Sequence, residues 1–265
     1  MKIYVSDLDG TLLTSNKKLP PDFAETLKLI DEANDMFFFA SGRSYEDVSK
    51  YLKDIDYPLN AICDNGAEVY INNQPKYECS MDKDDAELII ETFIKNDFGI
   101  LMLSTPTQTY KIMPTTVDPL DNKFLEDFYT QSIEISSYDE IKDDVLKIAI
   151  CTNKGSYDYL FDNYKDLNLN STKLTVSGFD WIDFVNSSVN KGNAIKHIIE
   201  LLDVTKDDIY CFGDYLNDIN MCEQSNHTYA MANAHPTIIE LFNETIKSND
   251  EFGVTCKIKE LLKTK

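Results

Sequence analysis

Both ends of the chain alternate short apolar runs with amphipathic helical segments, and this alternation restricts the possible fold more than any other feature. The first end places strand-like runs at 2–6, 36–40 and 60–64 around helical segments at 21–33 and 44–55. The second end has strand-like runs at 208–213 and 228–231 and helical segments at 190–202, 216–224 and 236–244. This order predicts an α/β fold with a Rossmann-like, doubly wound parallel sheet and right-handed crossovers.

The middle of the chain has a different order of predicted elements, because strand-like runs follow one another across short turns. Such spacing is typical of an antiparallel sheet with helices on one side. We therefore predict a core formed by residues 1–80 and 188–265, interrupted by an inserted α+β cap at 81–187.

Composition excludes several classes of protein. The formal net charge of the 265 residues is −21, which argues against a nucleic-acid or anionic-membrane partner. No apolar run is long enough to cross a bilayer and no targeting signal is visible, so we expect a cytoplasmic protein with no obligate protein partner. The six cysteines form no CxxC pair and the three histidines are isolated, which disfavours zinc.

Polar residues follow several strands of the predicted core at the point where each strand ends. Asp7 and Asp9 follow the first strand, Ser41-Gly42-Arg43 follows the second, and Asp214 and Asp218 follow "IYCFG". Ligands of open parallel sheets bind outside the carboxyl ends of the strands, so these groups are predicted to converge. Lys191, at the start of the helix after the insertion, is placed to reach the same edge.

This convergence predicts a cation site that accepts an anion. Neighbouring carboxylates raise one another's pKa unless a positive charge lies among them. Oxygen ligands without histidine or cysteine favour Mg²⁺. With the metal and Lys191 in place, the site could accept a phosphate, with Ser41 and nearby backbone N–H groups as neutral donors.

Four segments, "DLDGTL", "SGR", "KGNA" and "GDYLND", occur in the order of the motifs of the haloacid dehalogenase superfamily, which the chain resembles. The downstream "MANAHP" and "SNDEFGV" resemble the Cof-like, type IIB hydrolases of that superfamily. Ala232 stands where relatives usually have glycine. The resemblance covers both ends of the chain. It implies a Mg²⁺-dependent phosphatase that acts on small phosphorylated metabolites, with sugar phosphates as the first candidate substrates.

The resemblance also implies a role for each motif residue. Asp7 would be the nucleophile and Asp9 the general acid and base. Asp7, the Asp9 backbone carbonyl and Asp214 would ligate Mg²⁺, with Asp218 acting from behind these ligands. The residues implied in phosphate binding are Ser41, Gly42, Lys191 and Asn217.

Plainer interpretations exist for each motif taken alone. Asp-Gly also marks ordinary turns, Ser41-Gly42 could cap the following helix, and Asp218 could be a first-turn acid stabilised by the helix dipole. Arg43 fits an ion pair or the substrate edge better than catalysis. Two rival functions stay open: a phosphomutase with the same aspartyl-phosphate chemistry, and a non-catalytic sensor of a phosphorylated ligand.

Overall fold

The computed structural model describes residues 1–115, 132–152, 156–176 and 181–263, which form two compact units. Unit 1 consists of Met1–Tyr77 with Val189–Lys265, and unit 2 of Glu78–Ser188. The sequence predicts residues 1–80 with 188–265 for the core and residues 81–187 for the inserted cap. The interpretation of the second unit as a cap that selects substrates stays a prediction.

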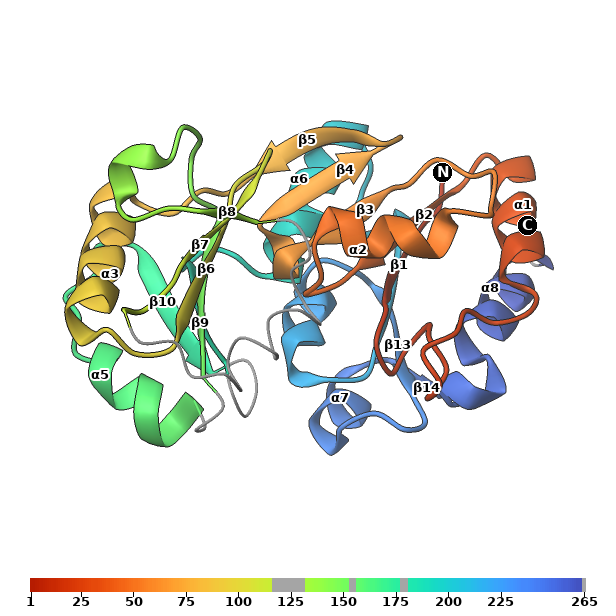
Figure 1. Cartoon of the computed structure of the whole chain (residues 1–265). Helices are drawn as coiled ribbons and strands as arrows, with labels where there is room; N and C mark the ends of the chain where they lie inside the picture. Colours follow the sequence, from red (N-terminus) through yellow and green to blue (C-terminus); the bar gives the residue numbers. More distant parts are fainter. Residues whose placement is uncertain (116–131, 153–155, 177–180, 264–265) are drawn as a thin grey trace. The chain divides into compact units, whose positions relative to one another are not determined.

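Unit 1 is built on an eight-stranded sheet of order β14-β13-β12-β1-β2-β3-β4-β5, which confirms the α/β class (Figure 1). The strands from β14 to β3 pair in parallel, and β3 pairs with β4 in antiparallel fashion. The strand bounds are Ile3–Asp7 (β1), Met36–Ala40 (β2), Ala61–Cys63 (β3), Glu68–Ile71 (β4), Gln74–Glu78 (β5), Ile209–Gly213 (β12), His227–Met231 (β13) and Glu244–Ile246 (β14).

Helices of unit 1 cover this sheet: α1 contacts β2, α2 contacts β3, α6 contacts β4 and α7 contacts β13, while α1 and α8 pack side by side (Figure 1). Their bounds are Phe23–Glu32 (α1), Tyr45–Ser49 (α2), Lys191–Leu202 (α6), Pro236–Leu241 (α7) and Gly253–Lys263 (α8). Phe23 of α1 meets Phe37 and Phe39 of β2 edge to face at 5.3 and 5.9 Å between ring centroids. Such pairs contribute about 0.5–1.5 kcal/mol each beyond burial, which fixes α1 on the sheet.

Three predicted helices take a different form. The segment predicted at 44–55 is α2 followed by the 3-10 turn Lys50–Leu52, and the helix predicted at 236–244 ends at Leu241, before β14. The sequence pattern predicts an α-helix at 216–224, but Leu216–Glu223 is a 3-10 helix. Its first turn is tied to the end of β12, because Asp218 accepts hydrogen bonds from the backbone N–H groups of Asp214 and Tyr215 at 2.9 and 3.2 Å. This local bonding competes with regular α-helical hydrogen bonds at the start of the segment.

Unit 2 contains a six-stranded sheet of order β10-β11-β9-β6-β7-β8, antiparallel except for the β7–β8 pair. The strands are Ile100–Ser104 (β6), Thr109–Ile112 (β7), Ile133–Glu134 (β8), Lys147–Cys151 (β9), Thr172–Val176 (β10) and Trp181–Asn186 (β11). The helices α3 (Lys83–Asn96) and α5 (Asp162–Tyr164) pack on one face, as the strand spacing predicts (Figure 1). Successive side chains of β6 point to opposite faces of the sheet. Leu101 and Leu103 join the core with α3, whereas Ile100 and Met102 lie on the other face.

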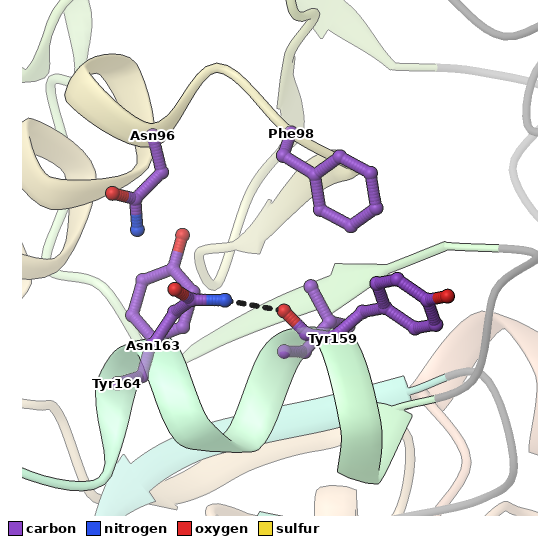
Figure 2. Close-up of a pocket in the computed structure, with 6 residues that line it drawn as sticks. Asn96, Phe98, Tyr159, Asn163 and Tyr164 are labelled. Carbon is purple, nitrogen blue, oxygen red and sulfur yellow. Dashed lines mark hydrogen bonds between the residues drawn. The ribbon is translucent and has the colours of Figure 1, made fainter.

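A pocket of about 200 Å³ opens in unit 2 between the end of α3 and the segment that leads into α5 (Figure 2). Its lining residues carry aromatic, amide and aliphatic side chains and are Asn96, Phe98, Tyr159, Leu160, Asn163 and Tyr164. None of the predicted site residues lines it. No helix in the described ranges is long and apolar enough to cross a membrane.

Candidate active site

The predicted site residues of unit 1 meet at one edge of the eight-stranded sheet. Asp7 is the last residue of β1 and lies opposite Ala40 of β2, so Ser41 follows directly beside it. On the other side of β1, Ser6 lies opposite Phe212 of β12, and Asp214 follows the end of that strand. The parallel register thus brings three chain segments together at their carboxyl ends, the edge where such sheets bind ligands.

Lys191 enters this edge as the first residue of α6, which Asn190 caps by accepting a hydrogen bond from the Asn193 backbone N–H at 2.8 Å. The Lys191 side chain is fully buried. Its Nζ atom donates to Asp7 Oδ1 at 2.5 Å and to Asp218 Oδ1 at 2.7 Å. Burial alone would lower the pKa of Lys191, but the charges of Asp218 and Asp7 outweigh it and raise that pKa. The lysine is therefore a fixed cation between two carboxylates.

Three carboxylates form a compact group. One oxygen from each of Asp7, Asp214 and Asp218 lies within 4.8 Å of the others. Asp7 Oδ2 is buried and, within the described residues, accepts no hydrogen bond. The pKa of Asp7 is raised to about 8, chiefly by burial, with Lys191 opposing the rise and the carboxylates of Asp218 and Asp214 adding to it. Burial likewise raises the pKa of Asp214 to about 6, against a hydrogen bond from Thr11.

These features fit a divalent cation bound through oxygen. A cation at this position would be bound by the Asp7 oxygen that otherwise has no partner in the described residues. It would also favour the ionised form of the Asp7 and Asp214 carboxyls. Asp218 is less available to bind a cation, since its Oδ1 accepts from Lys191 and its Oδ2 accepts from two backbone N–H groups. Its contacts suit a residue that orients Lys191 and the start of the Asp214 loop.

Asp9 stands outside this carboxylate group as the structure describes it. Its carboxylate accepts from Arg43 Nε at 2.8 Å and Nη2 at 2.9 Å, and from Lys17 Nζ at 2.7 Å. Partial burial raises the pKa of Asp9, but the hydrogen bonds from Arg43 and Lys17 lower it to about 2. Arg43 thus forms the ion pair that the sequence favoured over a catalytic role.

The glycine after Asp9 is required by close packing. Gly10 has φ +87°, and a Cβ there would lie 2.3 Å from Asp214 Oδ2. Asn233 of "MANAHP" donates from Nδ2 to the Gly10 carbonyl at 2.8 Å and accepts from the Asn249 N–H at 3.0 Å. The two downstream segments therefore support the loop that follows the first strand, even with alanine at position 232.

The other predicted phosphate-binding residues form a second group. Ser41 is buried, and its Oγ accepts from the Arg43 backbone N–H at 3.1 Å. Gly42 lies against Asn65, because a Cβ at residue 42 would be 2.9 Å from Asn65 Nδ2. Asn217 Nδ2 donates to Asn65 Oδ1 at 3.1 Å, so Asn217 contacts this amide and not the carboxylate group.

Sequence reasoning leaves Lys17 and Asn65 without a functional role. Asn65 has φ 56° within the turn Asp64–Gly66 that follows β3. The Asn-Gly pair at the carboxyl end of a predicted strand is the signal that could have placed Asn65 among the predicted site residues. For Lys17, the only signal is a basic residue eight positions after Asp9, which does not by itself indicate a contact.

Known proteins are similar to this chain over most of its length. The model of the haloacid dehalogenase-like hydrolase family matches residues 4–258. The Bacillus subtilis (strain 168) protein 5-amino-6-(5-phospho-D-ribitylamino)uracil phosphatase YwtE is 25% identical over 99% of this chain and 98% of its own length. The HMP-PP phosphatase of Enterobacter sp. (strain 638) is 25% identical over 90% of this chain and 86% of its own length.

A solved structure shows the same fold. The crystal structure of SMU.1108c from Streptococcus mutans UA159 superposes with a TM-score of 0.82 at 26% identity. The alignment covers 99% of each chain. The similarity therefore extends over both units and not only over the motif-bearing one.

Proposed function

The chain belongs to the haloacid dehalogenase-like hydrolase family, and from this membership we propose that it is a Mg²⁺-dependent phosphatase that hydrolyses small phosphomonoesters through an aspartyl-phosphate. One observation carries the proposal: a buried lysine and three carboxylates lie together at the carboxyl ends of parallel strands. Such a group has the charges that bind a cation and a phosphoryl group side by side. The predicted cytoplasmic location remains part of this proposal.

Asp7 and Asp9 divide the chemistry in the proposal. Asp7 attacks phosphorus, the bond from phosphorus to the ester oxygen breaks, and Asp9 gives a proton to the departing oxygen. This step requires protonated Asp9, which the structure disfavours, because burial raises the pKa of Asp9 but the hydrogen bonds from Arg43 and Lys17 lower it to about 2. Asp9 then takes a proton from water, which attacks phosphorus and breaks the Asp7 acyl-phosphate bond. Inorganic phosphate leaves and Asp7 is regenerated, so one difficult transfer becomes two easier ones.

The phosphoryl group and the metal would be held by the remaining residues. Lys191, Ser41, Gly42 and Asn217 are the proposed phosphate contacts. Asp7, Asp214 and the Asp9 backbone carbonyl are the proposed Mg²⁺ ligands. The bound cation would neutralise charge on the phosphoryl oxygens and reduce their repulsion with the carboxylates.

Sugar phosphates are the proposed substrates. A relative named for a phosphorylated ribityl compound, YwtE, aligns over nearly the whole chain. Unit 2 is proposed as the cap that selects the leaving group. Fold similarity does not identify the metabolite, so a phosphate-release screen over metabolite monophosphates is needed.

A burst assay tests the roles of the two aspartates. For Asp9→Asn with p-nitrophenyl phosphate, we expect a burst of about one nitrophenol per enzyme followed by near silence. The nitrophenolate leaves without an acid, whereas attack of water needs the base, which is worth about 10²–10⁴-fold. A sugar phosphate should give no burst, and Asp7→Asn should give neither burst nor turnover. Mass spectrometry of the quenched Asp9→Asn protein should find one phosphoryl group.

Five outcomes would count against the proposal. Steady turnover by Asp7→Asn, or unphosphorylated Asp9→Asn after the burst, would refute the assignment of the pair. Full activity in chelated, metal-free buffer would refute the metal requirement, because an uncompensated like-charge pair at about 4 Å costs roughly 4 kcal/mol. An isomeric sugar phosphate in place of inorganic phosphate would indicate a mutase, and ligand binding without either product would indicate a sensor.

A further inference from the structure

Two cationic residues, Arg43 and Lys17, contact the Asp9 carboxylate, and Lys17 lies outside the four motifs. Arg43 comes from the segment after β2, and its guanidinium lies 5.9 Å from the centroid of the Tyr51 ring. Lys17 comes from the loop after the first motif, and its side chain is 61% exposed. The Asp9 side chain is itself 34% exposed, so packing alone does not fix its orientation.

The loop that carries Lys17 has defined internal bonds. The Lys17 N–H donates to the Thr14 carbonyl at 2.8 Å, and the Thr14 N–H donates to the Lys18 carbonyl at 3.0 Å. Lys17 has φ 58°, a left-handed conformation that is uncommon for residues other than glycine. The short turn therefore sets the direction in which the Lys17 side chain leaves the backbone.

The same loop is anchored at a distant part of unit 1. The Ser15 backbone N–H donates to Asp250 Oδ1, and the Ser15 hydroxyl donates to Asp250 Oδ2, each at 2.8 Å. Asn249 donates from Nδ2 to the Leu13 carbonyl at 2.8 Å. Residues 249 and 250 thus tie both the start and the middle of the loop that presents Lys17.

The hydrogen bonds distinguish the two oxygens of Asp9. Among the residues that the structure describes, Oδ1 accepts from Lys17 Nζ and from Arg43 Nη2, whereas Oδ2 accepts from Arg43 Nε alone. A carboxylate has about four acceptor positions, two on each oxygen. In the described residues both acceptor positions of Oδ1 are therefore used, whereas Oδ2 uses one of its two.

We propose that Lys17 is a positioning residue, which acts with Arg43 to hold the Asp9 carboxylate in one orientation. The proposal rests on the proposed function, since it takes Asp9 as the group that moves the proton. It also assigns a role to Asp250, which holds the Lys17 loop in place without contacting the site.

Substitution of Lys17 should affect the rate more than binding. For Lys17→Met with a sugar phosphate, we expect kcat to fall about five- to tenfold with little change in KM. A misplacement of 1 Å can cost about 10²-fold, but Arg43 retains most of the orientation. Lys17→Arg, which keeps a cation there, should restore much of kcat. Lys18→Met is the matched control, because it removes the same charge from an exposed neighbour in the same loop and should match the wild type.

A double-variant comparison separates positioning from general loop stability. Asp250→Ala should lower kcat about two- to fivefold in the wild-type background, and this loss should disappear when Lys17 is already methionine. Equal losses in the two backgrounds would refute the role of Asp250 as an anchor for Lys17. A kcat for Lys17→Met equal to that of Lys18→Met would overturn the proposal for Lys17.

Crystal structures of the wild type and Lys17→Met give a readout that needs no activity. We expect a single Asp9 rotamer in the wild type and at least two in the variant. One unchanged rotamer in the variant overturns the proposal. If the wild type releases no phosphate from any substrate, the proposed function fails, while the Asp9 rotamers still decide whether Lys17 positions that carboxylate.

Discussion

Replacement of Lys191 by methionine should destabilise unit 1 strongly, because two carboxylates would lose their shared buried cation. The Lys191 Nζ atom lies 2.5 Å from Asp7 Oδ1 and 2.7 Å from Asp218 Oδ1, and the lysine and Asp218 side chains are fully buried. At an effective dielectric near 20, each contact is worth about 6 kcal/mol of attraction, most of which the desolvation of the charges offsets. Breaking a buried pair by removing one partner costs about 3–5 kcal/mol.

The measurement is urea unfolding followed by far-UV circular dichroism in metal-free buffer above pH 8, where the Asp7 carboxyl, with its pKa of about 8, is mostly ionised. We expect Lys191→Met to lower the free energy of unfolding by about 3–5 kcal/mol, a large part of the stability of an ordinary domain. The matched control is Lys196→Met on the exposed face of the same helix, which should change stability by less than about 0.5 kcal/mol.

A second variant identifies the cause of the loss. In Lys191→Met with Asp218→Asn, one of the two uncompensated carboxylates becomes neutral, so we expect about half of the lost stability to return. The introduced amide can still accept hydrogen bonds from the N–H groups of Asp214 and Tyr215 through its oxygen. A loss for Lys191→Met no larger than that of Lys196→Met, or no recovery in the double variant, would refute the reasoning.

Two further predictions concern the first motif. Burial raises the pKa of Asp7 to about 8, so the stability that its neutral form contributes is complete below about pH 4 and is lost as pH rises towards 8. In metal-free buffer, Asp7→Asn should therefore gain stability relative to the wild type between about pH 4 and pH 8 in urea titrations, and parallel pH profiles would contradict this. Gly10→Ala should cost about 1–3 kcal/mol and weaken Mg²⁺ binding at least tenfold by calorimetry, because its Cβ would overlap Asp214 at φ +87°. Unchanged Mg²⁺ affinity would show that Asp214 is not displaced.

The sequence by itself determined the sheet edge at which the site lies. Apolar runs and helical periodicity predict strands and crossovers, and in a parallel sheet the carboxyl ends of the strands share one edge. The strand ends are therefore enough to place Asp7, Ser41 and Asp214 on one edge of the sheet. Their closeness along that edge depends on the sheet order, in which β1 lies between β12 and β2. The start of α6 at Lys191 follows from the cap residue before it.

Only the tertiary structure decided how each side chain is paired. Asn217 contacts Asn65, which is 152 residues away, and Ser15 contacts Asp250 at a separation of 235, and no periodicity reports such contacts. Asp7 and Asp9 stand two residues apart in one motif, yet the pKa of Asp7 is raised to about 8 and that of Asp9 is lowered to about 2. The difference arises because Asp7 is buried with a single lysine between several carboxylates, whereas Asp9 is partly exposed between two cations. Burial and the placement of distant charges set a pKa, and both exist only once the chain has folded.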